Sequence, residues 1–149
     1  MRRSAGSEIR LCWSVRGPRL LSAARVRAAA RAALEHGGRA DIPLAIVFVS
    51  DAALARLHAR WLGDPSPTDV MAFDLGTEGT GPAGEIYVSV ERARAEARRR
   101  RMRPERELTL YVVHGCLHLC GFDDRSEGDR ALMRAAERTV LARTGYPGA

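Results

Sequence analysis

The sequence lacks the features that mark secreted, membrane-spanning and disulfide-bonded proteins. It contains three cysteines, an odd number that does not fit the paired framework of small secreted domains. Its start, Met-Arg-Arg-Ser-Ala-Gly-Ser-Glu, holds no apolar segment of a signal peptide, and no apolar run is long enough to span a membrane. These absences predict a cytoplasmic protein that does not contact membranes and keeps its cysteines reduced.

Two of the cysteines, Cys116 and Cys120, lie four residues apart in a segment that also holds two histidines. They are offset from the histidines by two residues, which puts them on roughly the opposite side of a helix. We therefore interpret them as small buried apolar residues. A second metal site formed by Cys12, Cys116 and Cys120 is a less favoured alternative.

The composition is that of one globular domain with an excess of positive charge. The 149 residues are 46% hydrophobic and 28% charged, which suffices for a hydrophobic core. The 24 basic residues exceed the 18 acidic ones and give a net charge of +6, carried by arginine. Guanidinium groups pair well with phosphate, so the charge is compatible with a nucleic-acid partner but favours one only weakly.

Hydrophobic periodicity and breaks predict nine elements in the order βαβαββααα. The predicted strands cover residues 8–16, 44–49, 68–73 and 84–89, and the predicted helices cover 20–34, 51–61, 91–103, 104–120 and 125–143. This order predicts a single domain over 1–149 of the α/β (α+β) class. We expect a mixed, mostly parallel four-stranded sheet, with helices packed around a central metal-bearing helix.

The most informative segment runs from His114 to Asp124 and reads His-Gly-Cys-Leu-His-Leu-Cys-Gly-Phe-Asp-Asp. His114 and His118 are four residues apart, so on a helix they share one face, where a single ion can bridge them. Gly121 suits the left-handed turn that ends a helix and reverses the chain, bringing Asp124 toward the same ion. Three protein ligands leave a position free for water or substrate, whereas structural zinc sites are closed by four. The spacing therefore predicts a metal site of the catalytic type.

Two alternatives concern the same segment. Asp123 could replace Asp124 as the third ligand, or could brace a ligand histidine from behind. Zinc proteases have a similar segment, but they need a glutamate directly after the first histidine as general base, and here that residue is Gly115. Because glycine within a helix costs stability, we expect Gly115 to leave space beside the metal. Peptide hydrolysis is thus a minor alternative.

With these residues in view, the sequence resembles the YbeY family of bacterial endoribonucleases and ribosomal-RNA maturation factors, whose motif is approximately H-G-x-L-H-L-x-G-[YF]-D-H. Residues 67–73, Pro-Thr-Asp-Val-Met-Ala-Phe, are similar to the family's P-T-D-V-L-S-F, and residues 84–89, Gly-Glu-Ile-Tyr-Val-Ser, to its G-D-I-x-I-S. Met133 and Glu137 stand where the family commonly has them. The main motif matches at His114, Gly115, Leu117, His118, Leu119, Gly121, Phe122 and Asp123.

The resemblance implies a single-strand-specific, metal-dependent endoribonuclease that acts in rRNA maturation, at the 3′ end of 16S rRNA, and in ribosome quality control. It implies Zn²⁺ as cofactor, with His114, His118 and Asp124 as metal ligands and catalytic residues. The implied partners are single-stranded rRNA and the ribosome or its small-subunit proteins, with a GTPase suggested by the family and no DNA expected. Cleavage could proceed by attack of water or of the ribose 2′-hydroxyl.

Two departures from the family pattern affect this site. The third metal position is Asp124, where the family usually has histidine. A carboxylate there makes the ion a weaker Lewis acid and lets other divalent metals compete with zinc. In the loop before the Thr-Asp-Val motif, Leu62 takes the place where the family often has an arginine implicated in RNA handling.

Several further residues are candidates for contact with RNA. Thr68, Arg60 and Glu85 are the candidate cleft residues, although Thr68 could instead cap a turn and Glu85 a strand end. We expect Asp69 to brace the turn that precedes its strand. Arginines between Arg92 and Arg106 could line a track for the RNA backbone or form a solvated helix face. Trp13 and Trp61 are expected in the core.

Three functions are therefore in competition. The first is the metal-dependent endoribonuclease that the resemblance implies. The second is a ribosome-assembly RNA-binding factor whose metal is structural, which a fourth protein ligand would favour. The third, less favoured, is a zinc hydrolase acting on peptides or small molecules.

Overall fold

The computed structural model describes residues 8–62, 69–76, 79 and 81–146. Its elements follow the predicted order. They are strand β1 (Ile9–Trp13), helix α1 (Ala23–His36), β2 (Leu44–Val49), α2 (Asp51–Leu62), β3 (Val70–Asp74), β4 (Gly84–Ser89), α3 (Val90–Arg100), α4 (Pro104–Leu119) and α5 (Glu127–Arg143). The first strand is shorter than predicted and the first helix begins later, because the side chain of Ser22 accepts a hydrogen bond from the Arg25 backbone and caps the helix there.

The four strands form one mixed sheet in the order β1-β2-β4-β3. β2 runs parallel to both β1 and β4, and β3 pairs antiparallel with β4, so the prediction of a mixed, mostly parallel sheet is confirmed. β3 is an edge strand. Residues 70–74 of this strand line a cavity described below.

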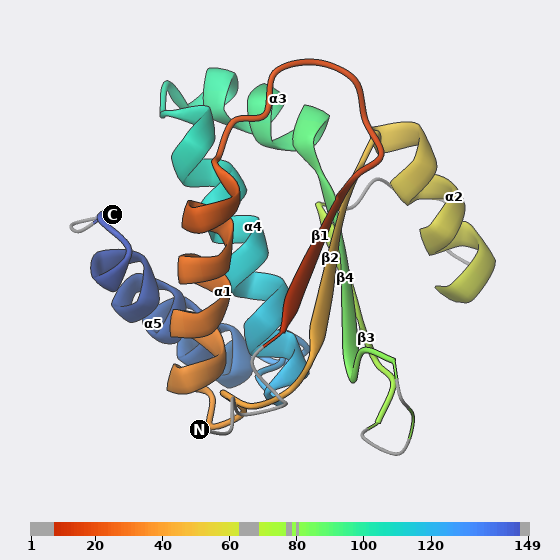
Figure 1. Ribbon diagram of the computed structural model, residues 1–149. Helices are drawn as coiled ribbons and strands as arrows, with labels where there is room; N and C mark the ends of the chain where they lie inside the picture. The colour runs from red at the N-terminus through yellow and green to blue at the C-terminus, as the bar shows by residue number, and fades with distance from the viewer. Residues whose placement is uncertain (1–7, 63–68, 77–78, 80, 147–149) are drawn as a thin grey trace.

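The helices cover the two faces of the sheet unequally (Figure 1). α1 and α4 lie on one side of the sheet, with α5 packed against these two helices, and α2 is the described helix that packs on the other face. α4 is the central helix because it contacts α1, α3, α5, β3 and β4, as predicted for the motif helix. The main core lies between this helical layer and the sheet, and its fully buried large side chains include Phe48, Ile46, Ile86, Leu108, Leu117 and Met133. Burying one such side chain stabilises the fold by about 1.5–3 kcal/mol.

The two tryptophans differ in their environment. Trp13 stacks on Phe48 with the ring centroids 3.8 Å apart and packs against the core, as expected. Trp61, near the end of α2, is 61% exposed, so the expectation that it lies in the core is wrong. Its ring meets the Phe73 ring edge-on at a centroid distance of 6.1 Å and lies beneath the Arg60 guanidinium, on the side of the sheet where α2 packs.

None of the helices in the described part of the chain combines the length and the apolar character needed to cross a membrane.

Candidate metal centre

α4 presents both motif histidines on one face. Their Nε2 atoms point at each other and are 3.0 Å apart, and the two rings meet nearly at right angles, with an interplanar angle of 80°. Both side chains are half-buried. The helix begins with Pro104 at its first position and has Glu105 and Glu107 in its first turn, where the helix dipole favours negative charge.

The turn that ends α4 brings a carboxylate to the two imidazoles. Gly121 has a positive φ of 99°, the Phe122 N–H donates to the Leu117 carbonyl, and the Gly121 N–H donates to the His118 carbonyl. This is the Schellman arrangement, and it sends the chain back along the helix as predicted. Asp124 Oδ2 then lies 3.7 Å from His114 Nε2 and 3.6 Å from His118 Nε2.

These three side chains have the geometry of a metal site. The ligand atoms of His114, His118 and Asp124 all lie within 4.8 Å of one another. A tetrahedral zinc ion with bonds near 2 Å would hold its ligand atoms about 3.4 Å apart, close to the observed separations of 3.0, 3.6 and 3.7 Å. Within the described ranges this group comprises three residues, and Asp124 is its most exposed member.

Neither alternative ligand set is brought together. The carboxylate of Asp123 accepts a hydrogen bond from the Asp124 backbone and pairs with Arg125 at 3.2 Å, so it shapes the loop that carries Asp124. Cys116 is fully buried, and burial raises the pKa of its thiol. Cys12 is exposed on β1 and Cys120 is half-buried, and the cysteines do not form a group of potential ligands in the part of the chain that the structure describes.

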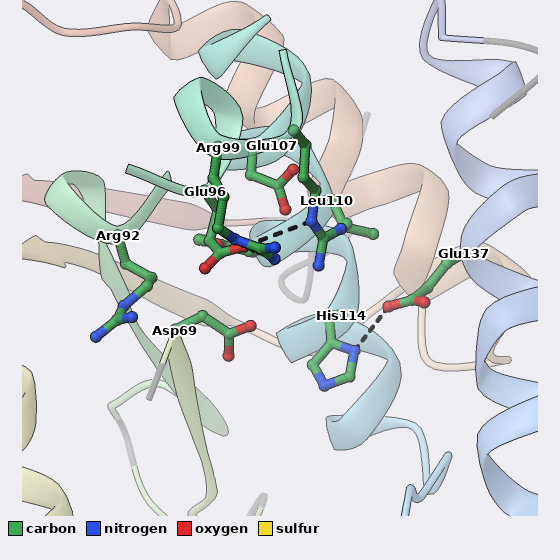
Figure 2. Close-up of a pocket in the computed structure, with 10 residues that line it drawn as sticks. Asp69, Arg92, Glu96, Arg99, Glu107, Leu110, His114 and Glu137 are labelled. Atoms are coloured by element: carbon green, nitrogen blue, oxygen red, sulfur yellow. Dashed lines mark hydrogen bonds and ion pairs between the residues drawn. The ribbon is translucent and has the colours of Figure 1, made fainter. Parts of the chain in front are cut away.

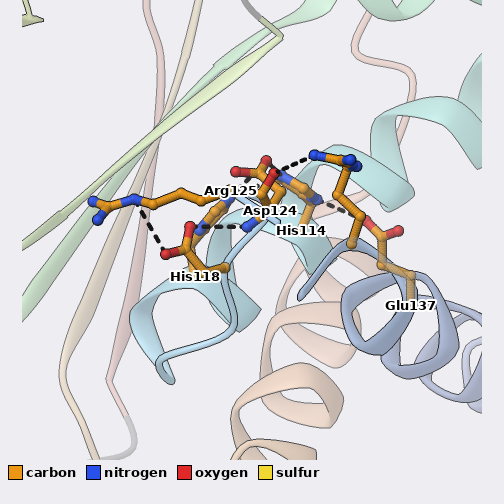
Figure 3. Close-up of polar contacts among 7 residues, drawn as sticks. His114, His118, Asp124, Arg125 and Glu137 are labelled. Carbon is orange, nitrogen blue, oxygen red and sulfur yellow. Dashed lines mark hydrogen bonds and ion pairs between the residues drawn. The ribbon is translucent and has the colours of Figure 1, made fainter. Parts of the chain in front are cut away.

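Glu137 on α5 orients the first histidine. Its Oε2 lies 2.7 Å from His114 Nδ1, on the opposite side of the imidazole from Asp124 (Figure 3). Burial disfavours the protonated ring, but the hydrogen bond and charge of Glu137, aided by Asp69 and Asp124, outweigh it and raise the pKa of His114. A proton held on Nδ1 by Glu137 leaves the Nε2 lone pair free for a metal, as in many zinc sites.

His118 has the opposite electrostatic balance. Burial and the positive charge of a protonated His114 lower its pKa, and this outweighs the raising influence of Asp124 and Asp123. Its ring also makes a hydrogen bond to the Phe122 backbone, which ties it to the turn after α4. The lowered pKa favours the neutral imidazole, the form that binds a metal.

Two cavities flank the histidine pair. The first, of about 510 Å³, opens beside His114 and is lined mainly by charged side chains (Figure 2). Its lining residues are Asp69, Arg92, Glu96, Arg99, Arg100, Glu107, Leu110, Tyr111, His114 and Glu137. The second, of about 440 Å³, runs along β3 and is lined by His58, residues 70–74, His118, Leu119, Asp123, Asp124 and Arg125. The candidate metal ligands thus lie between two cavities.

The predicted RNA contacts have different positions relative to these cavities. Arg60 is exposed on α2, with its guanidinium 5.7 Å above the Trp61 ring, and Glu85 lies beside Tyr87 on β4. Neither lines either cavity. Thr68 lies outside the described residues, as does the side chain of Leu62. Contact of Arg60, Thr68 and Glu85 with RNA stays a prediction.

Gly115 has a different role from the one expected. A Cβ atom added to it would lie 2.8 Å from Ile86 Cγ2 and 3.0 Å from Val70 Cγ2. The glycine therefore allows α4 to pack closely on β3 and β4. The expectation that it leaves space beside the metal is wrong, because the sheet fills that space.

Sequence reasoning assigned no role to Glu137 and only a turn-bracing role to Asp69. In the structure Glu137 forms a hydrogen bond with His114, and Asp69 lies on the wall of the first cavity. The Asp69 carbonyl accepts from the Ser89 N–H of β4, and the turn that we expected Asp69 to brace lies outside the described residues. The only sequence signal for Glu137 was its place in the resemblance, since its partner is 23 residues away on another helix.

Comparisons with known proteins agree on one family. The sequence profile described as endoribonuclease YbeY matches residues 19–145. A protein of that name from an Anaeromyxobacter species is 37% identical over 135 residues, covering 89% of this chain and 70% of the relative. One from Rhodopseudomonas palustris is 32% identical over 143 residues, covering 91% and 84%. The solution structure of a Thermotoga maritima protein matches with a TM-score of 0.61 at 23% identity over 91% of this chain and 88% of that one, which supports the fold.

Proposed function

The chain belongs to the endoribonuclease YbeY family, and on this premise we propose that it is a metal-dependent endoribonuclease that cleaves single-stranded RNA. The observation that carries the proposal is the convergence of His114, His118 and Asp124 between two cavities. Three ligands and an open side are the arrangement of catalytic metal sites. We assign these three residues as ligands and catalytic residues.

A divalent ion held by these ligands would supply Lewis-acid stabilisation of charge on a phosphoryl oxygen. Residues around the ion position orient the ligands and keep one side of the position open. Glu137 holds the proton of His114 on Nδ1, so that Nε2 faces the ion position. Asp124 comes from a loop and is half-exposed, so it closes the site without covering the side from which a phosphodiester approaches.

The flanking cavities support a chain-like substrate. One lies on the His114 side and the other on the side of His118 and Asp124, so a strand crossing the metal position would occupy both. Of the arginines between Arg92 and Arg106, three line the first cavity, namely Arg92, Arg99 and Arg100. Guanidinium groups there favour binding of the phosphate backbone.

We further propose the biological setting that family membership suggests. The substrate is rRNA, cleaved in maturation at the 3′ end of 16S rRNA and in ribosome quality control in the cytoplasm, with the ribosome and its small-subunit proteins as partners. Zn²⁺ is the proposed cofactor, because two imidazoles and one carboxylate at these separations suit it. The carboxylate also admits other divalent ions.

The site disfavours the two competing functions. A structural metal would call for a fourth protein ligand, and the group in the described ranges has three. A zinc protease would need a glutamate in place of Gly115, and that position faces Ile86 and Val70 on the sheet rather than the metal.

The proposal is tested by cleavage of a labelled single-stranded RNA by the wild type and His114→Ala. We expect cleavage by the metal-loaded wild type, its loss with chelator, its return with added Zn²⁺, and none by the variant. Thermal denaturation of both proteins serves as the folding control. Equal cleavage by the two proteins, or cleavage indifferent to chelator, would refute the proposal. Cleavage of peptides but not RNA would favour the hydrolase alternative.

A further inference from the structure

The cavity beside His114 contains a buried carboxyl group that the metal site does not use. Glu107 is only 2% exposed, and it lies on the cavity wall at the far end from Asp69 and His114 (Figure 2). On α4 it precedes His114 by seven residues, so both side chains lie along one face of the helix. The cavity therefore extends from the metal ligands toward the start of α4, and Glu107 is at its end.

This carboxyl group has no hydrogen-bond partner among the described residues. Its Oε2 atom is buried and unpaired. The nearby Glu96 differs, because it pairs with Arg99 at 2.7 Å and Arg100 at 3.4 Å. A buried acceptor without a partner is unfavourable and rare in native proteins, and it commonly marks a place where a ligand supplies the missing group.

The same cavity also contains a buried donor without a partner. The Nε atom of Arg92, on α3, is unpaired, and in Figure 2 Arg92 lies across the cavity from Glu107. A ligand that satisfies both walls must carry N–H or O–H donors and also acceptors. A metal ion would not, and Glu107 does not belong to a group of potential metal ligands in the described chain.

A nucleotide has both kinds of group and the right length. Seven residues along a helix correspond to a rise of about 10 Å, which is of the order of the distance from a backbone phosphate to the outer edge of its base. A carboxylate repels phosphate, and the ribose hydroxyl lies closer to its phosphate than this distance. The group that reaches Glu107 is therefore the base, through an N–H. Adenine, cytosine and guanine carry an exocyclic amino group. Uracil carries only a ring N3–H, which lies between two carbonyl oxygens that a carboxylate repels, so it is the poorer donor to Glu107.

We propose that Glu107 accepts a hydrogen bond from the exocyclic amino group of an unpaired base next to the scissile phosphate, so that the enzyme disfavours uridine at this position. This inference rests on the proposed function and assigns Glu107 as the residue that selects the base. It also gives single-strand preference a physical basis, because in a duplex the amino group is bonded to the opposite base.

The test compares binding and cleavage of labelled oligocytidylate and oligouridylate, two flexible pyrimidine strands that differ at the amino group. The metal-loaded wild type, Glu107→Gln and Glu105→Gln are titrated at pH 8, with fluorescence anisotropy read directly after mixing and cleavage followed on the same strands. Glu105→Gln is the matched control, since it removes the same charge two residues away, outside the cavity. Thermal midpoints report folding.

We expect the wild type and Glu105→Gln to bind oligocytidylate roughly tenfold more tightly than oligouridylate. Glu107→Gln should reduce this ratio to about threefold or less, because an amide also donates to the uracil carbonyl. Equal binding of both strands by the wild type would overturn the inference. The same holds if Glu107→Gln keeps the wild-type ratio of affinities for the two strands. Cleavage of both strands without a preference would support the proposed function and overturn this inference. Tighter binding of oligocytidylate without any cleavage would support the contact of Glu107 with the base and overturn the proposed function.

Discussion

The hydrogen bond that His114 Nδ1 donates to Glu137 predicts a measurable loss of metal affinity when the charge of Glu137 is removed. The 2.7 Å contact joins a carboxylate to the ring nitrogen opposite the one that faces the ion position. Replacing Glu137 by glutamine keeps the shape and an acceptor but removes the charge that makes the imidazole a better ligand. Outer partners of this kind are worth 10- to 100-fold in metal affinity, or roughly 1.4–2.7 kcal/mol. Glu137→Ala should lose at least as much.

The pH dependence separates this role from a general effect on folding. Glu137 raises the pKa of His114, so in the metal-free wild type a proton competes with the ion as pH falls. Glu137→Gln lowers that pKa and weakens the competition, so its deficit in affinity should be greatest above pH 8 and smaller near pH 6. Zinc affinity is measured by competition with a chromophoric chelator, and the His114 pKa by NMR. Exposed Glu127→Gln on the same helix is the control. Wild-type affinity of Glu137→Gln at pH 8.5 would refute the reasoning.

Three further predictions concern single residues. Asp124→Ala should lose more zinc affinity than Glu137→Gln because it removes a ligand. Asp124→His should keep one zinc per chain, which elemental analysis checks. It should also shift RNA cleavage to lower pH, which a pH–rate profile checks, because a neutral ligand leaves the ion more positive. Gly115→Ala should lower the free energy of unfolding, measured by urea denaturation, by about 1 kcal/mol or more. A methyl group 2.8 Å from Ile86 Cγ2 destabilises the fold more than the gain in helix propensity stabilises it. An unchanged urea midpoint would contradict the close packing of α4 on the sheet. Burial raises the pKa of Glu107 above its ordinary 4.5, so the folded protein binds more protons than the unfolded chain and its stability falls as pH rises above 4.5. The thermal midpoint of Glu107→Gln should therefore increase relative to that of the wild type as pH rises. A difference between the two midpoints that does not change with pH would contradict this prediction.

The fold was predictable because each local signal in this chain agrees with the tertiary structure. The apolar run at 44–49 is buried between two parallel neighbours, and caps such as Ser50, which accepts from the Ala53 N–H, start helices where expected. The exceptions are Trp61 and the ends of β1 and α1. Their environment depends on which elements cover them. Trp61 is exposed because, among the described helices, α2 is the one that packs on that side of the sheet. Hydrophobicity alone does not carry that information.

The candidate site was predictable only where its members are close in sequence. His114, His118 and Asp124 follow from helical spacing and a glycine turn, and the structure brings them together. Glu137 and Glu107 could not be found in this way. The first reaches His114 from another helix, and the second is an acidic residue in a helix's first turn, where solvated carboxylates are common. Their roles depend on burial and on partners, which periodicity does not specify.

Gly115 illustrates why this motif excludes the chemistry of zinc proteases, which it otherwise resembles. In α4 the residue after the first histidine is turned about 100° around the helix axis from it, and here that direction faces the sheet. Ile86 and Val70 lie so close that even a methyl group would collide with them. A glutamate general base at this position would have to displace β3 and β4. The acidic groups that raise the pKa of His114 are instead Glu137, Asp69 and Asp124, and Glu137 and Asp69 line the first cavity. The contact of α4 with the sheet thus limits the reactions that the helix can support.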